Sequence, residues 1–259
     1  MALSRPYPIE IALADGTVLR GMEHPADGPP LLFVHDLGED LDAWGSVAPA
    51  VRSQGFRVIC LELRGHGLSD GEPDPSATVG DLVGALAEVT GAFGPVGLVL
   101  HGEAASAAFE LGPGHGAPVH AVISPTPGPD SDGDDDGDGG TGGGDTRSPT
   151  PGPDSDGDDD GDGGTGGGAP VAAMRVLFTG AHDEPVHEHV RATHPKMRGQ
   201  NMWISTGTAQ RGPTLLQEHP HLVEQLVMFM RRHLTAHHLA WIAEQTSNRQ
   251  DSKERDSDQ

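Results

Sequence analysis

The stretches LLFVHDLGED, at residues 31–40, and LELRGHGLSD, at residues 61–70, decide the fold of this chain. Each begins with an apolar run that predicts a buried strand and continues into a polar turn that contains glycine. Short apolar runs of this kind alternate with longer helix-like segments over most of the chain. The alternation predicts an α/β fold with a mostly parallel central sheet flanked by helices.

Hydrophobic spacing gives the expected elements. In residues 78–93, apolar side chains recur every three to four positions, as they do in a helix that lies on a sheet. Further helices are expected over 42–53, from Val186, and from about His221 to the end of the globular part. Strands are expected at 9–14, 17–23, 31–35, 56–61, 96–101, 119–123, 174–179 and 201–205.

An acidic segment interrupts this pattern at residues 124–168. It consists of one sequence that occurs twice, at 124–144 and 148–168, and it contains none of the residues that build a core. Its 13 aspartates and one arginine contribute −12 to the net charge of −23. A segment with nothing to bury cannot offset the entropy cost of ordering, so it is expected to be a disordered insert. The prediction is one domain formed by residues 1–123 and 169–244, with a disordered polar tail at 245–259.

Charge and composition exclude several classes of function. Both the insert and the remainder are acidic, which argues against a nucleic-acid partner. Cys60 is the single cysteine, so the chain has no internal disulfide framework. The first residues lack the apolar region of a signal peptide, and no stretch approaches the roughly 20 apolar residues that span a bilayer. The expectation is a cytoplasmic protein without a membrane contact and without a cofactor.

Each repeat contains the first half of a calcium loop. Asp132, Asp134 and Asp136 precede Gly137, as oxygen ligands do in such loops, but position twelve is Gly143 instead of a bidentate glutamate. Residues 130–162 are therefore expected to be a solvated linker, with weak divalent-cation binding as the alternative.

The two opening stretches together resemble the α/β-hydrolase superfamily, whose third strand ends in His-Gly-x-Gly and whose fourth runs into Asp-x-Arg-Gly-His-Gly-x-Ser-Asp. The resemblance extends in order and spacing over nearly the whole chain outside the repeat. It implies that residues 64–67 brace the loop beside an active site. It also implies that the amide of Leu37 is one donor of an oxyanion hole.

The family's nucleophile elbow has the form small-x-Ser-x-small, at a sharp turn from strand to helix. Here the strand that ends at His101 continues as Gly102-Glu103-Ala104-Ala105, which places Gly102 at the serine position and makes the amide of Glu103 the second oxyanion donor. Glycine supplies no nucleophile. Ser106 is the nearby hydroxyl, and it is kept as an alternative nucleophile.

The remaining positions of the family's triad are an acid and a base. The run VLFTGAHD, at residues 176–183, matches the strand before the acid, and implies that Asp183 is retained. The base falls on Gln210 or Arg211, and neither an amide nor a guanidinium acts as a general base at neutral pH. If the position is Arg211, an ion pair with Asp183 is expected. His219 or His221 reaching the site is the alternative.

The interpretation is a catalytically impaired protein of α/β-hydrolase fold that lacks its nucleophile and base, with a small molecule as a possible ligand. The alternative is an active serine hydrolase of esterase or lipase type that uses Ser106. Lyase or oxygenase chemistry without a cofactor is a third interpretation.

Overall fold

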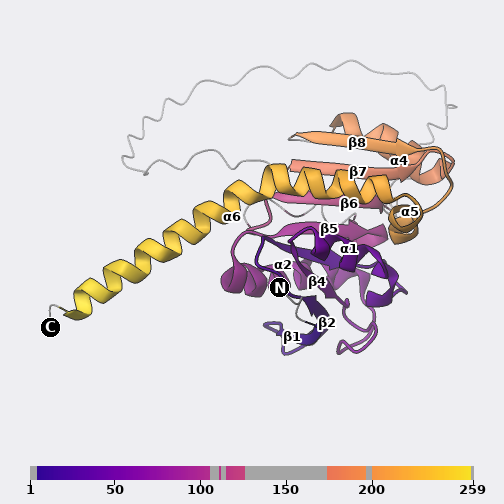
Figure 1. The fold of residues 1–259 in the computed structure, drawn as a ribbon. Coiled ribbons are helices and arrows are strands. Elements are labelled where there is room, and N and C mark those ends of the chain that lie inside the picture. Colours follow the sequence, from indigo (N-terminus) through magenta and orange to yellow (C-terminus); the bar gives the residue numbers. More distant parts are fainter. Residues whose placement is uncertain (1–4, 106–110, 112–114, 126–173, 197–199, 258–259) are drawn as a thin grey trace, which may run out of the picture.

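The computed structural model describes residues 5–105, 111, 115–125, 174–196 and 200–257. These residues form a single eight-stranded sheet with helices on both faces (Figure 1). The strand order is β1-β2-β4-β3-β5-β6-β7-β8. From β4 to β8 neighbouring strands run parallel, whereas β2 pairs antiparallel with both β1 and β4. The predicted fold class is confirmed.

The eight strands lie where the apolar runs predicted them, within two residues at most ends. The central strands are buried on both faces, as strands of a parallel sheet between helix layers must be. The strands are β1 (Tyr7–Ala12), β2 (Val18–His24), β3 (Pro30–Val34), β4 (Arg57–Leu61), β5 (Gly97–His101), β6 (Val119–Pro125), β7 (Met174–Gly180) and β8 (Asn201–Thr206).

Two apolar clusters lie on opposite faces of the sheet. On one face, α2 (Thr78–Phe93) and α4 (Glu184–Thr193) bury their apolar sides. On the other face are α1 (Val47–Ser53), α5 (Gly212–Glu218) and the first part of α6 (Pro220–Ser257). Successive residues of each central strand alternate between the two clusters. Short 3₁₀ helices complete the connections: η1 (Leu41–Trp44), η2 (Pro75–Ala77) and η3 (His194–Lys196).

Three boundaries differ from the sequence prediction. The helix expected over 42–53 is divided into η1 and α1, because Gly45 adopts a positive φ of 31° between them. β6 continues through Ser124 and Pro125, two residues into the predicted insert, and both are buried. The rest of the insert lies outside the described residues.

The third difference concerns the predicted disordered tail. α6 continues to Ser257, and its second half extends away from the body of the molecule (Figure 1). The polar residues 243–257 contain no glycine or proline and several good helix formers, so nothing in their sequence ends the helix begun on the sheet. Residues 245–257 of the tail that the sequence predicts to be disordered are therefore helical in the structure.

Candidate active site

The turn after β5 has the geometry of a nucleophile elbow. β5 ends at His101, and residues 102–105 are already helical. Gly102 has φ of 62°, in the left-handed region that residues with a Cβ rarely adopt, and it is buried. A sharp turn of this kind is what exposes the nucleophile in an α/β-hydrolase. The elbow backbone is present without a nucleophilic side chain.

The space above Gly102 is filled by the carboxylate of Asp36, which follows β3. A Cβ placed on Gly102 would lie 1.9 Å from Cγ of Asp36 and 2.1 Å from each of its oxygens. These distances are far below van der Waals contact. An elbow side chain and the observed position of Asp36 therefore exclude each other.

The same carboxylate occupies the predicted oxyanion hole. Oδ1 of Asp36 accepts the backbone N–H of Leu37 at 2.8 Å and that of Glu103 at 2.7 Å. These are the two amides that the family resemblance implies as oxyanion donors, and they come from the ends of β3 and β5. The amides converge as expected, and an anion of the chain itself lies between them.

Asp36 was given no role in the sequence analysis, although the sequence departs from the family motif at this residue. The family pattern His-Gly-x-Gly reads His35-Asp36-Leu37-Gly38 in this chain, so aspartate stands at the first glycine of the motif. A glycine at this position leaves the oxyanion hole empty, whereas an aspartate side chain is long enough to enter it. The departure from the motif at residue 36 could have pointed to the filled site.

The retained acid is paired with arginine. Asp183 lies between β7 and α4 and is buried, and one of its oxygens accepts a hydrogen bond from Nη2 of Arg211, the residue before α5. Arg211 is largely exposed. Asp183 Oδ2 has no hydrogen-bond partner among the described residues. Of the two predicted base positions, Arg211 is thus the one that faces Asp183, and the expected ion pair is present.

The other candidates do not join this group. The backbone carbonyl of Gln210 lies against Gly180, and its side chain makes no hydrogen bond or ion pair within the described part of the chain. His219 and His221 contact each other at the junction of α5 and α6, with ring centroids 5.8 Å apart. Neither of them makes a hydrogen bond or ion pair with Asp36 or Asp183 within the described residues. Ser106 lies outside those residues.

Two histidines brace the loop that carries Asp36. Nε2 of His35 accepts the N–H of Leu63 at 3.1 Å, and Nε2 of His66 accepts the N–H of Gly38 at 2.9 Å. Each loop therefore supplies one imidazole and one backbone amide to the other. Both rings must be neutral at Nε2 to accept, which leaves Nδ1 of His35 to donate to the carbonyl of Asp36 at 2.7 Å. Burial lowers the pKa of His35, which favours this neutral form.

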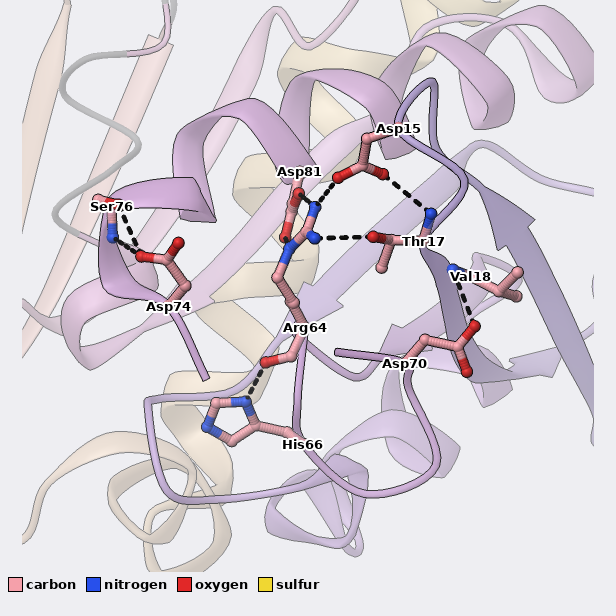
Figure 2. Close-up of polar contacts among 9 residues, drawn as sticks. All are labelled: Asp15, Thr17, Val18, Arg64, His66, Asp70, Asp74, Ser76 and Asp81. Atoms are coloured by element: carbon pink, nitrogen blue, oxygen red, sulfur yellow. Dashed lines mark hydrogen bonds and ion pairs between the residues drawn. The ribbon is translucent and has the colours of Figure 1, made fainter. Parts of the chain in front are cut away.

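The loop after β4 is in turn fixed by Arg64 (Figure 2). The guanidinium binds both oxygens of Asp81 on α2, at 2.9 and 2.7 Å, and reaches Asp15 in the β1–β2 turn at 2.7 Å. The N–H of Thr17 and then Arg64 lower the pKa of Asp15 to about 2. His66 donates from Nδ1 to the carbonyl of Arg64 at 2.8 Å. The Arg64–Gly67 segment therefore braces the site loop, as the resemblance implied.

Contacts of His101 and Ser124 fix the backbone at Gly212, next to Arg211. Nδ1 of His101 lies 3.2 Å from Glu39, and this contact lowers the pKa of Glu39. The other nitrogen of His101 packs against Gly212, where a Cβ would lie 2.2 Å from it. The N–H of Gly212 donates to the hydroxyl of Ser124 at 3.0 Å. None of these residues was singled out for a role from the sequence.

Some other kinds of site are not found in the described part of the chain. No cluster of three or more histidine, cysteine or carboxylate side chains there could hold a metal ion. No helix among the described residues is both long and apolar enough to cross a membrane. A groove of about 560 Å³ opens between α1 and α6, beside Met228, and it does not include the elbow.

Comparisons with known proteins agree with this architecture. A family model for the α/β-hydrolase fold matches residues 29–102. Epoxide hydrolase 2 of Siraitia grosvenorii is 41% identical over 64 residues, which are 23% of this chain and 20% of that protein. An epoxide hydrolase of Caballeronia sordidicola is 36% identical over 64 residues, with the same shares. This chain therefore matches only about a fifth of the length of these curated relatives.

Among solved structures, the esterase Pf2001 of Pyrococcus furiosus superposes with a TM-score of 0.59 at 13% identity, over 88% of this chain and 93% of that one. At this identity the likeness shows the fold alone. The sheet order, the elbow and the family match together define the class: this chain has the α/β-hydrolase fold. The sequence match to the family model for this fold lies in residues 29–102.

Proposed function

We propose that this protein has the α/β-hydrolase fold without serine-hydrolase activity. The observation that carries the proposal is that Oδ1 of Asp36 accepts both oxyanion amides. In acyl transfer these amides stabilise the negative oxygen of the tetrahedral intermediate. Here a carboxyl oxygen of the chain itself already accepts both N–H groups, so a substrate oxygen would have to displace it.

The lack of a nucleophile and of a general base also argues against serine-hydrolase activity. Gly102 offers no nucleophile. The group that faces Asp183 is the guanidinium of Arg211, which cannot accept a proton from a nucleophile. Loss of the serine or the histidine of such a triad typically costs on the order of a millionfold in turnover. Loss of one oxyanion donor costs about 100- to 1000-fold. Little catalysis is left for the remaining backbone to provide.

The alternative is an active serine hydrolase that uses Ser106. No observation on the described residues favours it, and it stays a prediction. The matched relatives are named epoxide hydrolases, but the matches span too little of their length to carry that activity to this chain. We also keep as proposals a cytoplasmic location, a small-molecule ligand, and weak divalent-cation binding by residues 130–162.

The proposal is tested with a fluorophosphonate probe and with short p-nitrophenyl esters. We expect no covalent labelling and no hydrolysis above the buffer rate, since the described residues place no hydroxyl at the elbow and a guanidinium at the base position. An active serine hydrolase in the same assay shows that the reagents work. Labelling mapped to Ser106 by mass spectrometry, and abolished by Ser106→Ala, would establish the alternative instead.

A further inference from the structure

The carboxylate of Asp36 occupies its position as a bound ligand would. Two N–H groups from separate loops converge on one of its oxygens, and the glycine beneath it leaves the space open. One of these bonds joins residues 67 positions apart, so it links the end of β3 to the start of the helix after β5. The side chain is half-buried and Oδ2 has no partner among the described residues, so the amide pair is the chief fixed contact of the carboxylate.

We propose that the amides of Leu37 and Glu103 form a binding site for a small monocarboxylate, which the chain fills with its own Asp36 side chain. The proposal deepens the proposed function, because it rests on the same occupied oxyanion hole. The part of aspartate beyond Cα is a methylene and a carboxylate. Asp36→Gly therefore removes a group with the size and charge of acetate.

Charge and size set the class of ligand. Hydrogen bonds from N–H to a carboxylate are roughly twice as strong as those to a neutral acceptor, so acetate is favoured over acetamide of the same shape. The nearby carboxylates Glu39 and Glu103 oppose an anion, which limits affinity to the millimolar range. In the native chain the tethered carboxylate is at a high effective concentration. External carboxylates therefore do not displace it.

The experiment measures thermal unfolding of four proteins: the parent, Asp36→Gly, Asp36→Asn and Asp36→Ala. We expect Asp36→Gly to melt about 5–10 °C below the parent, because the link between the two loops is lost. With a Kd of about 10 mM, 100 mM acetate multiplies its ratio of folded to unfolded protein by about 11. That factor recovers about 3–6 °C.

Matched conditions make the result specific. Sodium chloride at equal concentration and neutral acetamide should leave the Asp36→Gly protein at its lower melting temperature. The parent and Asp36→Asn should not respond to acetate, because their side chains fill the space. If Asp36→Gly does not fold, Asp36→Ala takes its place with formate, which matches the carboxylate that alanine lacks.

Two outcomes would overturn the inference: no carboxylate response in either small variant, or an equal response to chloride or in the parent. Saturation-transfer NMR on acetate gives a second readout that does not depend on unfolding. Failure of the proposed function is distinguishable, since it would appear as fluorophosphonate labelling of the parent whether or not acetate binds.

Discussion

Residue 102 has no room for a side chain while residue 36 is aspartate. The Cβ of any replacement would overlap the Asp36 carboxyl carbon at 1.9 Å, and the φ of 62° is costly for residues other than glycine. Relief of the overlap requires Asp36 to leave its two amides. The two positions are therefore energetically coupled, although they follow different strands, β3 and β5.

We predict that Gly102→Ser lowers the free energy of unfolding by about 2–4 kcal/mol, from backbone strain and from the displaced carboxylate. Asp36→Gly should reduce this cost, so that a double-mutant cycle measured by urea unfolding gives a coupling of about 1–2 kcal/mol. Gly207→Ser is the matched control. A Cβ at Gly207 meets nothing within 4 Å, and we expect a change within about 0.5 kcal/mol. Additive effects of the two site substitutions would contradict the steric account.

At the scale of elements, the loops after β3 and β4 are held together by exchanged hydrogen bonds. Each imidazole accepts a backbone N–H from the other loop, so each contact requires an unprotonated Nε2. The histidine rings lie with centroids 5.2 Å apart, and a charge on either ring disfavours a charge on the other. The position of Asp36 therefore depends on the neutral state of His35, which precedes it.

The pH dependence follows from the lowered pKa of His35. A histidine whose pKa is lower in the folded than in the unfolded chain contributes stability that is present above the unfolded pKa, about 6.5, and is lost as pH falls below it. His35→Gln should be less stable than the parent at pH 7 and should lose less stability between pH 7 and pH 5. Buried His120, whose pKa is lowered to about 4, remains in both proteins, so their difference isolates His35.

The control for this pH measurement is His237→Gln, since His237 is exposed on α6. It should reproduce the parent's pH profile of unfolding free energy. If His35→Gln also keeps the parent's pH profile of unfolding free energy, protonation of His35 does not weaken the contact between the two loops.

The turn after β5, the two converging amides and the buried Asp183 are all present, so a designed gain of activity tests whether their geometry can support a triad. We predict that Asp36→Gly, Gly102→Ser and Arg211→His, with Glu103→Leu to remove a nearby charge, together give measurable hydrolysis of short p-nitrophenyl esters. Gly102→Ser with Arg211→His alone should stay inactive, because Asp36 still fills the oxyanion hole. The gain should be lost on adding Asp183→Asn, since that carboxylate orients the new histidine. Activity indifferent to Asp183 would show that the triad has been placed wrongly.

At the scale of the whole molecule, the sequence predicted the sheet well because its strands are short apolar runs with little local ambiguity. Motif spacing also put Gly102 and Glu103 at the turn after β5, Leu37 after β3 and Asp183 after β7, and the structure has them there, while their catalytic roles stay a prediction. It missed Asp36 because which space a side chain enters depends on the packing of two loops 67 residues apart. The choice between Gln210 and Arg211 likewise needed the three-dimensional positions of α5 and β7.

Removal of most of the acidic repeat should leave the fold intact. We predict that replacing residues 126–165 by a Gly/Ser linker of about ten residues, long enough to return from β6 to the start of β7, shifts the melting temperature by no more than a few degrees. The physical reason is that the entropic cost of closing a loop grows only with the logarithm of its length. Millimolar calcium should change the melting temperature of the full chain equally little. Collapse of the fold on deletion, measured by circular dichroism, would show that the repeat packs or binds a structural ion.

The overlap between Asp36 and a side chain at residue 102 also orders the mutational paths open to this protein. If Gly102→Ser comes first, the serine side chain overlaps the Asp36 carboxylate and destabilises the chain. If Asp36→Gly comes first, the space above residue 102 is empty and the serine can be accommodated. The reverse route has the same order: serine must be lost before aspartate can settle on the amides. With aspartate at residue 36, the single substitution Gly102→Ser therefore destabilises the fold before it can contribute to hydrolysis.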